Sequence, residues 1–269
     1  MSKKIGFIGC GKMAQAMIAG MIQSSFLQSD DIIVSSKTLE TCKYVHKTYK
    51  VFYTLDNKKV ADFADIIILA VKPHLYADVM EEIKGELSKN TIVVTIAAGI
   101  DLTYMTGKLG KEAKIIRSMP NTPSLVGEGM TVFCSSQTVV EEELNYMKQL
   151  FSSFGAVEVM EEKIMDYIPA ISGSSPAYVY LFIEALADGG VRSGIPREAA
   201  YKLAAQAVLG AAKMVLETGK HPGVLKDEVC TPGGATIEAI ATLERKQFRG
   251  TILDAMESCD LKNIALNNK

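Results

Sequence analysis

The chain has 269 residues, of which 48% are hydrophobic, enough apolar material for one large folded domain or two smaller ones. Its 29 basic and 31 acidic residues leave a formal net charge of -2, so it lacks the positive charge typical of nucleic-acid-binding or membrane-surface proteins. No apolar run approaches the length of a membrane span, and the N-terminal residues lack the apolar core of a signal peptide. A cytosolic location is therefore expected.

The cysteines and histidines exclude several kinds of site. The five cysteines are odd in number and widely spaced, with no CxxC pair, so neither a disulfide framework nor a thiolate zinc site is expected. The three histidines, His46, His74 and His221, are scattered along the chain. The sequence therefore predicts no metal ion and no histidine-based catalysis.

In chain order, the first predicted element is a buried strand at Ile5–Ile8, which leads through two glycines into a helix at Met13–Ile22. This order is typical of the unit that binds a dinucleotide pyrophosphate, although a plain turn is the alternative. Gly9 permits the tight turn, Gly11 lets the backbone approach the phosphates, and Ala14 replaces the third glycine of the pattern. The predicted cofactor-binding residues of this segment are Ile8, Gly9, Cys10, Gly11, Lys12 and Met13.

The second predicted strand, Asp31–Ser36, ends where a unit that prefers NAD carries an acidic residue for the adenosine ribose. The residues here are Ser35, Ser36 and Lys37, with no carboxylate to accept the 2′-hydroxyl or repel a 2′-phosphate. Because two hydroxyls and a lysine suit a phosphate, the sequence favours NADPH over NADH. The alternative is a polar strand–helix junction with a solvated Lys37.

Two further strands, Ala64–Val71 and Thr91–Ile96, are continuous apolar runs typical of the centre of a parallel sheet. Ligands of doubly wound sheets bind beyond the carboxyl ends of the strands, where small residues let a ribose or nicotinamide lie against the backbone. Lys72 is either a ligand contact or an exposed lysine before a helix that Pro73 opens. The predicted cofactor-binding residues after these strands are Ala70, Val71, Lys72, Pro73, Ala97, Ala98 and Gly99.

The next strand, Ala113–Met119, leads into a loop that contains two prolines. Asn121 in this loop can hydrogen-bond a carboxamide and is a predicted cofactor contact, with a proline-defined turn as the alternative. A strand–helix–strand segment from Met130 to Val159 completes the sheet. Residues 1–162 are therefore predicted to form a Rossmann-type α/β dinucleotide-binding domain.

From about Asp166 onward the strand-like runs stop and helical patterns begin, so residues 163–269 are predicted to form an all-α domain. Glu184 and Asp188 share a helix face, either as a solvated or interface-capping pair or as an acid–base pair. The domain is too apolar to stand alone, which predicts a homodimer through this unit. The predicted helices are Ala177–Ser193, Pro196–Thr218 ending at Gly219, Ala235–Leu243 and Gln247–Ile264.

A second glycine-rich helix start, Pro232-Gly233-Gly234-Ala235-Thr236, precedes the third of these helices. The backbone N–H groups of such a turn can hold a substrate carboxylate, because a helix N-terminus presents unpaired donors and a partial positive charge. Thr236 lies in the first helical turn, where its hydroxyl can reach the same ligand. A helix cap without a ligand is the alternative.

Motifs along the whole chain, in the expected order, resemble those of the pyrroline-5-carboxylate reductase family. The most specific is Thr231–Ile237 with Leu243 and Glu244 behind it, whereas the glycine loop is common to many nucleotide-binding proteins. The departures, Cys10 in the glycine loop and Thr231 where many members carry serine, leave the predicted chemistry unchanged. The other matching segments are Phe7–Met13, Ala70–Pro73, Arg117–Pro123, Ser172–Tyr178 and Pro222–Asp227.

The resemblance implies an enzyme that reduces the cyclic imine L-1-pyrroline-5-carboxylate to L-proline with NADPH or NADH, the final step of proline biosynthesis. It implies a helical domain that interlocks between two subunits, and it leaves open whether the dimers assemble into rings. It also implies that the backbone of Gly233, Gly234 and Ala235 holds the substrate carboxylate. Thr236 would hydrogen-bond the ring nitrogen, and Asn57 would lie near the adenosine ribose.

Two other functions share parts of this pattern. A 3-hydroxy-acid dehydrogenase resembles the chain in layout, but that family uses a lysine on its first long helix, and the corresponding run from Gly173 to Gly189 contains none. A non-catalytic NADP-sensing dimer would keep the glycine loop but would not need a second anion-binding turn. Both are less well supported than the reductase.

Overall fold

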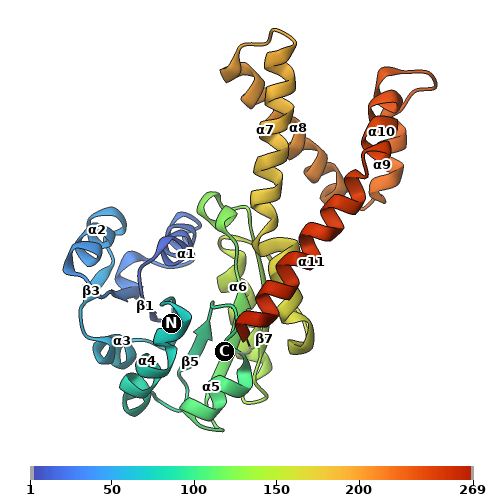
Figure 1. The fold of residues 1–269 in the computed structure, drawn as a ribbon. Coiled ribbons are helices and arrows are strands. Elements are labelled where there is room, and N and C mark those ends of the chain that lie inside the picture. Colours follow the sequence, from blue (N-terminus) through green and yellow to red (C-terminus); the bar gives the residue numbers. More distant parts are fainter. Residues whose placement is uncertain (1–2, 268–269) are drawn as a thin grey trace. The chain divides into compact units, whose positions relative to one another are not determined.

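The computed structural model of the chain describes residues 3–267 (Figure 1). Internal contacts divide it into two compact units. The sheet unit comprises the residues up to Ser174 together with those from Cys259 onward, and the helical unit comprises Ser175–Ser258. Each unit is described separately below.

One eight-stranded sheet forms the centre of the sheet unit, in the order β3-β2-β1-β4-β5-β6-β7-β8. Neighbouring strands are parallel except β6 and β7, which are antiparallel. Because β1 has β2 on one side and β4 on the other, the order reverses there, as in a doubly wound fold. The strands are β1 (Ile5–Ile8), β2 (Ile32–Ser35), β3 (Phe52–Thr54), β4 (Ile66–Leu69), β5 (Ile92–Thr95), β6 (Lys114–Met119), β7 (Gly129–Ser135) and β8 (Gly155–Val159).

Helices cover both faces of this sheet, because successive side chains of a strand point to opposite sides. Phe7 of β1 packs in a cluster with residues of α1 (Lys12–Gln23), α2 (Leu39–Tyr49) and α6 (Glu141–Ser152). The next residue, Ile8, packs in a second cluster with α3 (Asn57–Phe63), α4 (Tyr76–Ile83) and α5 (Leu102–Leu109). These two clusters make the sheet unit a three-layer α/β structure, which confirms the predicted Rossmann-type fold.

The strands and helices that carry the predicted cofactor loops lie where the sequence indicates. The sequence analysis missed β3 and α3, because β3 has three residues and its Phe52 and Tyr53 are exposed at the sheet edge. Short turns of helix connect the larger elements: η1 (Ser29–Asp31), η2 (Pro73–Leu75), η3 (Lys84–Glu86), η4 (Thr122–Val126), η5 (Glu162–Tyr167) and η6 (Pro169–Gly173).

The helical unit consists of α7 (Ser175–Arg192), α8 (Arg197–Thr218), α9 (Pro222–Val229), α10 (Ala235–Arg245) and the first half of α11 (Phe248–Asn267). Helix α8 ends as predicted, with Gly219 in the left-handed conformation at a φ of 63°. The sequence analysis did not predict α9. Pro222 opens this helix, and the His221 ring caps it by accepting the N–H of Gly223 at 3.0 Å.

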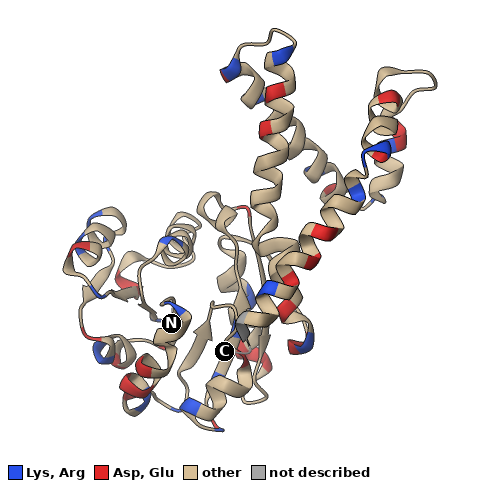
Figure 2. Ribbon diagram, in the orientation of Figure 1, with Lys and Arg blue, Asp and Glu red and all other residues tan. Residues whose placement is uncertain are grey.

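The helical unit buries very little of its apolar surface. Among described residues 175–258, the buried hydrophobic residues are three alanines at positions 187, 200 and 204. Larger side chains lie on the surface, including Leu181 at 68% exposure and Leu216 at 84%. Figure 2 shows no charged residue along the first half of α7. Monomeric proteins rarely expose so much contiguous apolar surface, so this unit has the character of an interface.

No helix among residues 3–267 combines the length and the apolar composition needed to cross a membrane.

The packing of α1 against Phe154, which lies between α6 and β8, can be tested at Gly20. An alanine β-carbon there would lie 2.3 Å from Cβ of Phe154, so Gly20→Ala is expected to lower the free energy of unfolding by about 1–3 kcal/mol. Gly107→Ala in α5 is the control, because no atom lies within 4 Å of its added β-carbon, and it should stabilise the helix by up to about 1 kcal/mol. Urea denaturation measures both effects, and equal stabilities of the two variants would contradict the packing described.

Candidate active site

The loop between β1 and α1 is held in one conformation by the backbone of the neighbouring strand. Gly9 has a φ of +97°, and an added β-carbon would lie 2.6 Å from the carbonyl oxygen of Ala70. The N–H of Gly9 donates to the carbonyl of Ser35 at 3.0 Å, and the N–H of Ala70 donates to the carbonyl of Ile8 at 2.8 Å. Only glycine satisfies both the conformation and the close approach. The chain therefore turns at the point where three parallel strands end side by side.

The start of α1 has the features of a phosphate site. Gly11 caps the helix without a side-chain hydrogen bond, and no acidic residue occupies the first turn. No atom lies within 4 Å of a β-carbon built on Gly11, so the space beside its backbone is open. The first N–H groups of a helix lack intrahelical acceptors and attract anions. These residues fit the pyrophosphate of a dinucleotide.

The other predicted cofactor residues follow the same edge of the sheet. Ile8 lies in register with Ser35 of β2 and Leu69 of β4, and Leu69 lies in register with Thr95 of β5. The segments that follow these four residues therefore emerge next to one another. They contain the predicted cofactor-binding positions Gly9–Met13, Ser36–Lys37, Ala70–Pro73 and Ala97–Gly99. Lys72 is exposed and stands directly before the turn that Pro73 opens.

A chain of side-chain hydrogen bonds begins at the end of β2. The hydroxyl of Ser35 is buried and donates to Oδ1 of Asn57 at 2.7 Å. The amide of Asn57 in turn donates from Nδ2 to the carboxylate of Glu82 at 2.8 Å. Ser36 is half-buried and Lys37 is exposed, so these two remain available to a ligand at this point. The sequence analysis missed Glu82, because it lies on α4, far along the chain from β2.

Beneath the ends of β4 to β6, buried hydroxyls brace the backbone. The Tyr76 hydroxyl donates to the carbonyl of Leu69 at 2.5 Å and accepts from the Thr95 hydroxyl at 3.1 Å. The N–H of Ala97 donates to the Thr95 hydroxyl, and Ser118 donates to the Thr95 carbonyl. Burial raises the pKa of Tyr76 to about 12, so this phenol stays neutral and supports the site without ionising. The sequence analysis did not identify Tyr76, because no motif surrounds it in the sequence.

Asn121 is buried, and both ends of its amide have partners within the sheet unit. Its Oδ1 accepts from the N–H of Met130 at 2.8 Å, and its Nδ2 donates to the carbonyl of Ser172 at 2.9 Å. The amide therefore joins the loop after β6 to β7 and to the end of η6. A contact with a cofactor carboxamide would use its remaining N–H and stays a prediction.

Two buried side chains near these loops, Cys10 and Arg117, have partners within the protein and support the fold. The Cys10 thiol donates to the carbonyl of Ser35 at 3.4 Å, and burial raises its pKa to about 12, so it holds no reactive thiolate near neutral pH. The Arg117 guanidinium pairs with Glu162 and Asp166 and so ties β6 to η5. Within residues 3–267 no cluster of histidine, cysteine or acidic residues is arranged to hold a metal ion.

In the helical unit, the turn before α10 has the geometry of a second anion site. Gly233 has a φ of +67°, and the N–H of Gly234 donates to the carbonyl of Thr231 at 3.0 Å. Gly234 caps α10 without a side-chain hydrogen bond, and a β-carbon there would lie 2.3 Å from the Thr231 hydroxyl oxygen. Glu238 adds one negative charge later in the first turn. The turn thus requires glycine and presents unpaired N–H groups.

Thr236 is half-buried in the first turn of α10, and among the described residues its hydroxyl has no hydrogen-bond partner. It is therefore free to bind a ligand held by the turn. The acidic pair on α7 has a different environment. Asp188 forms an ion pair with Arg197 at 2.5 Å, which links the end of α7 to the start of α8.

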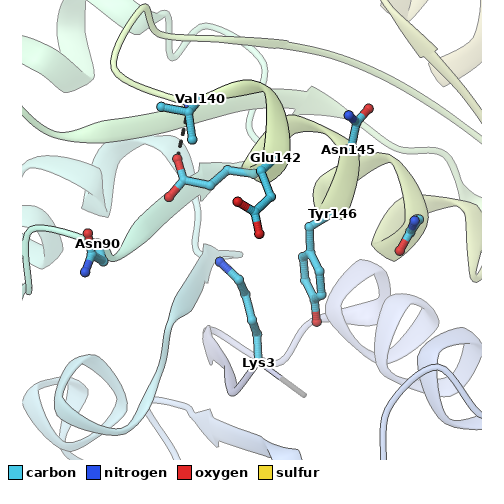
Figure 3. A pocket seen from close by; sticks show the side chains of 8 residues that line it. Lys3, Asn90, Val140, Glu142, Asn145 and Tyr146 are labelled. Carbon is cyan, nitrogen blue, oxygen red and sulfur yellow. Dashed lines mark hydrogen bonds between the residues drawn. The ribbon is translucent and has the colours of Figure 1, made fainter. Parts of the chain in front are cut away.

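A separate open hollow of about 690 Å³ lies at the opposite edge of the sheet (Figure 3). Lys3 and Asn90, which precede β1 and β5, line it together with Val140 and Tyr146 at α6. The Lys3 ammonium lies 5.3 Å from the centroid of the Tyr146 ring. Because this hollow is at the amino ends of the parallel strands, it is not part of the cofactor site.

Comparison with known proteins identifies the family. Residues 162–266 match the family model described as pyrroline-5-carboxylate reductase dimerisation, and residues 4–99 match the model described as NADP oxidoreductase coenzyme F420-dependent. The chain is 46% identical over 267 residues to the pyrroline-5-carboxylate reductase of Escherichia coli, with 99% of each chain covered. The chain belongs to the pyrroline-5-carboxylate reductase family. A family member from Synechocystis is 40% identical, with 100% of each chain covered.

Solved structures of family members share the fold. The reductase of Plasmodium falciparum, with NADP bound, superposes with a TM-score of 0.88 at 34% identity and 98% coverage of each chain. The reductase of Coxiella burnetii gives a TM-score of 0.91 at 34% identity and 99% coverage of each chain. The chain is therefore an oxidoreductase of this family, and neither alternative from the sequence analysis is supported by these relatives.

Because the space beside Gly11 is open, a substitution there can affect cofactor binding without affecting stability. Gly11→Ala should leave the free energy of unfolding within about 0.5 kcal/mol of wild type, because its β-carbon meets no protein atom. The same β-carbon would enter the space of the pyrophosphate, so affinity for NADP⁺ should fall by about tenfold or more. Gly9→Ala should instead lose both stability and binding. Thermal unfolding and calorimetric titration measure the two, and unchanged NADP⁺ affinity in Gly11→Ala would contradict the site.

Proposed function

We propose that this protein reduces L-1-pyrroline-5-carboxylate to L-proline with a reduced nicotinamide dinucleotide, as the final step of proline biosynthesis. The observation that carries the proposal is the presence of two glycine-dependent turns at helix starts in one chain, in a family whose curated members are named for this reaction. One turn suits the phosphates of a dinucleotide, and the other suits the carboxylate of a small amino-acid-like substrate.

Residues 1–162 are proposed to bind the dinucleotide. The backbone at Gly9–Met13 would hold the pyrophosphate, and the segments after β4 and β5 would lie along the nicotinamide half. Ser36 and Lys37 are available at the end of β2 and would contact a 2′-phosphate, which favours NADPH. When bound, the reduced nicotinamide supplies the hydride that this reaction requires.

Residues 163–269 are proposed to bind the substrate. The N–H groups at Gly233, Gly234 and Ala235 lie around the turn that opens α10, where they would orient the carboxylate. Thr236 would hydrogen-bond the ring nitrogen, and its free hydroxyl can serve as donor or acceptor there. The two contacts together would fix the ring, which places the C=N carbon for hydride addition.

The chemistry needs little acid–base equipment from the chain. A protonated imine is already electrophilic at the carbon beside nitrogen, and hydride addition removes its positive charge. An ordinary threonine hydroxyl is too weak an acid to act alone, so Thr236 would keep the nitrogen protonated by hydrogen bonding rather than by full proton transfer.

The helical unit is proposed to form a homodimer with a second copy of the chain. Its described residues bury only small alanines and expose leucines and aromatic side chains along α7 and α8. Association of two such units would bury these side chains and so supply the core that one copy lacks. Light scattering distinguishes this dimer from a monomer and from a ring of dimers.

The reaction can be measured directly with the purified protein. Racemic pyrroline-5-carboxylate should cause oxidation of NADPH with formation of one proline per NADPH, detected by mass spectrometry. The Gly11→Ala variant serves as the folded control with weakened cofactor binding. A protein that binds NADPH but forms no proline would contradict the proposed function.

Thr236 can be tested separately from the cofactor. Thr236→Ala should lower kcat by about ten- to a hundredfold, because loss of a hydrogen bond to a charged group costs about 1.5–3 kcal/mol. Thr236→Ser keeps the hydroxyl and should recover most of the activity. Affinity for NADPH should stay unchanged in both, since Thr236 belongs to the helical unit. Full turnover by Thr236→Ala at saturating substrate would remove this residue from the mechanism.

A further inference from the structure

The hydrogen-bond chain from Ser35 through Asn57 to Glu82 has only one possible direction. An ionised carboxylate carries no proton, so Glu82 can only accept, and Asn57 must turn its NH₂ group toward it. The Asn57 carbonyl oxygen then faces Ser35, whose hydroxyl must donate. Glu82 thereby sets the orientation of the amide and the donor role of the serine, although it touches only Asn57.

This chain lies at the part of a dinucleotide site that reads the adenosine ribose. Ser35 is the last residue of β2, and its carbonyl accepts the N–H of Gly9 in the phosphate loop at 3.0 Å. In doubly wound folds the group at the end of this strand decides between a 2′-hydroxyl and a 2′-phosphate. The sequence has no acidic residue at the end of β2, but the fold brings Glu82 of α4 close to this position.

Glu82 and Lys37 carry opposite charges at this end of the site and would have opposite effects on a bound 2′-phosphate. Glu82 is exposed, and within residues 3–267 it forms no ion pair with a lysine or arginine. Its charge is 2.8 Å from the Asn57 nitrogen, where it would repel a nearby phosphate. Ser35 has its only proton engaged by Asn57, so it cannot donate to a phosphate oxygen either. Lys37, which is exposed, carries the charge that would attract one.

We infer that Glu82 is a positioning residue that acts through Asn57 to limit the preference for a 2′-phosphate, so that NADH is accepted beside NADPH. The inference rests on the proposed dinucleotide site. Its basis is the fixed direction of the hydrogen-bond chain together with an unpaired carboxylate at the ribose end. Glu82→Gln removes the charge. The amides of Asn57 and of the new glutamine can then both turn over, so that Asn57 donates to the Ser35 oxygen and the Ser35 hydroxyl is free to donate to a ligand.

The test measures the dissociation constants of NADP⁺ and NAD⁺ by calorimetric titration, so it needs no imine substrate and no turnover. Glu82→Gln should raise the preference for NADP⁺ over NAD⁺ by about three- to tenfold, mainly by tighter NADP⁺ binding. Glu81→Gln removes the same charge from the neighbouring position of α4 and should leave the ratio within about twofold of wild type. Lys37→Ala should move the ratio in the opposite direction.

A second variant separates positioning from simple support of the fold. Glu82→Ala removes both the charge and the anchor of Asn57, so it should weaken NAD⁺ binding while Glu82→Gln leaves NAD⁺ binding unchanged. Because Glu82 is exposed, thermal unfolding of the free proteins should be similar in all variants. An unchanged nucleotide ratio in Glu82→Gln would overturn the inference alone. Absence of binding of either nucleotide to the wild-type protein would overturn the proposed function as well.

Discussion

The close approach of Gly9 to the backbone of Ala70 is the constraint on which the proposed cofactor site depends. It forces the chain out of β1 at a φ of +97° and fixes where α1 begins, with its unpaired N–H groups facing open space. The ends of β2, β4 and β5 lie in register around it. The carbonyl of Ser35 accepts a hydrogen bond from the N–H of Gly9, and the N–H of Ala70 donates one to the carbonyl of Ile8. One backbone approach thus brings together the loops that we propose bind the phosphates, the ribose and the nicotinamide.

The two units meet different physical demands. The sheet unit has two large apolar clusters, one on each face of its sheet, and it can hold a loop under conformational constraint because the surrounding core is complete. The helical unit has a small alanine cluster and an exposed apolar surface. Pairing with a second copy of the chain, as we propose, would supply the core that this unit lacks.

Local patterns predicted most of the fold, and spatial contacts account for what was missed. The strand at Ile5–Ile8 and the end of α8 at Gly219 follow from short-range rules of burial and helix capping. Edge strand β3 has too few buried residues to show a pattern. Glu82 could not be connected with Ser35 from the sequence, because the contact requires β2, α3 and α4 to pack together. The same limit applies to Tyr76, whose role appears only where β4 and β5 end side by side.

The central claim is that the chain brings a hydride donor and a cyclic imine together for direct transfer. The measurement that tests it most directly uses NADPH carrying deuterium at both positions of nicotinamide C4, with pyrroline-5-carboxylate as substrate. The account predicts proline with one deuterium, located on the ring carbon beside nitrogen at the end remote from the carboxylate. Proline formed without deuterium, or deuterium found at any other carbon, would contradict it.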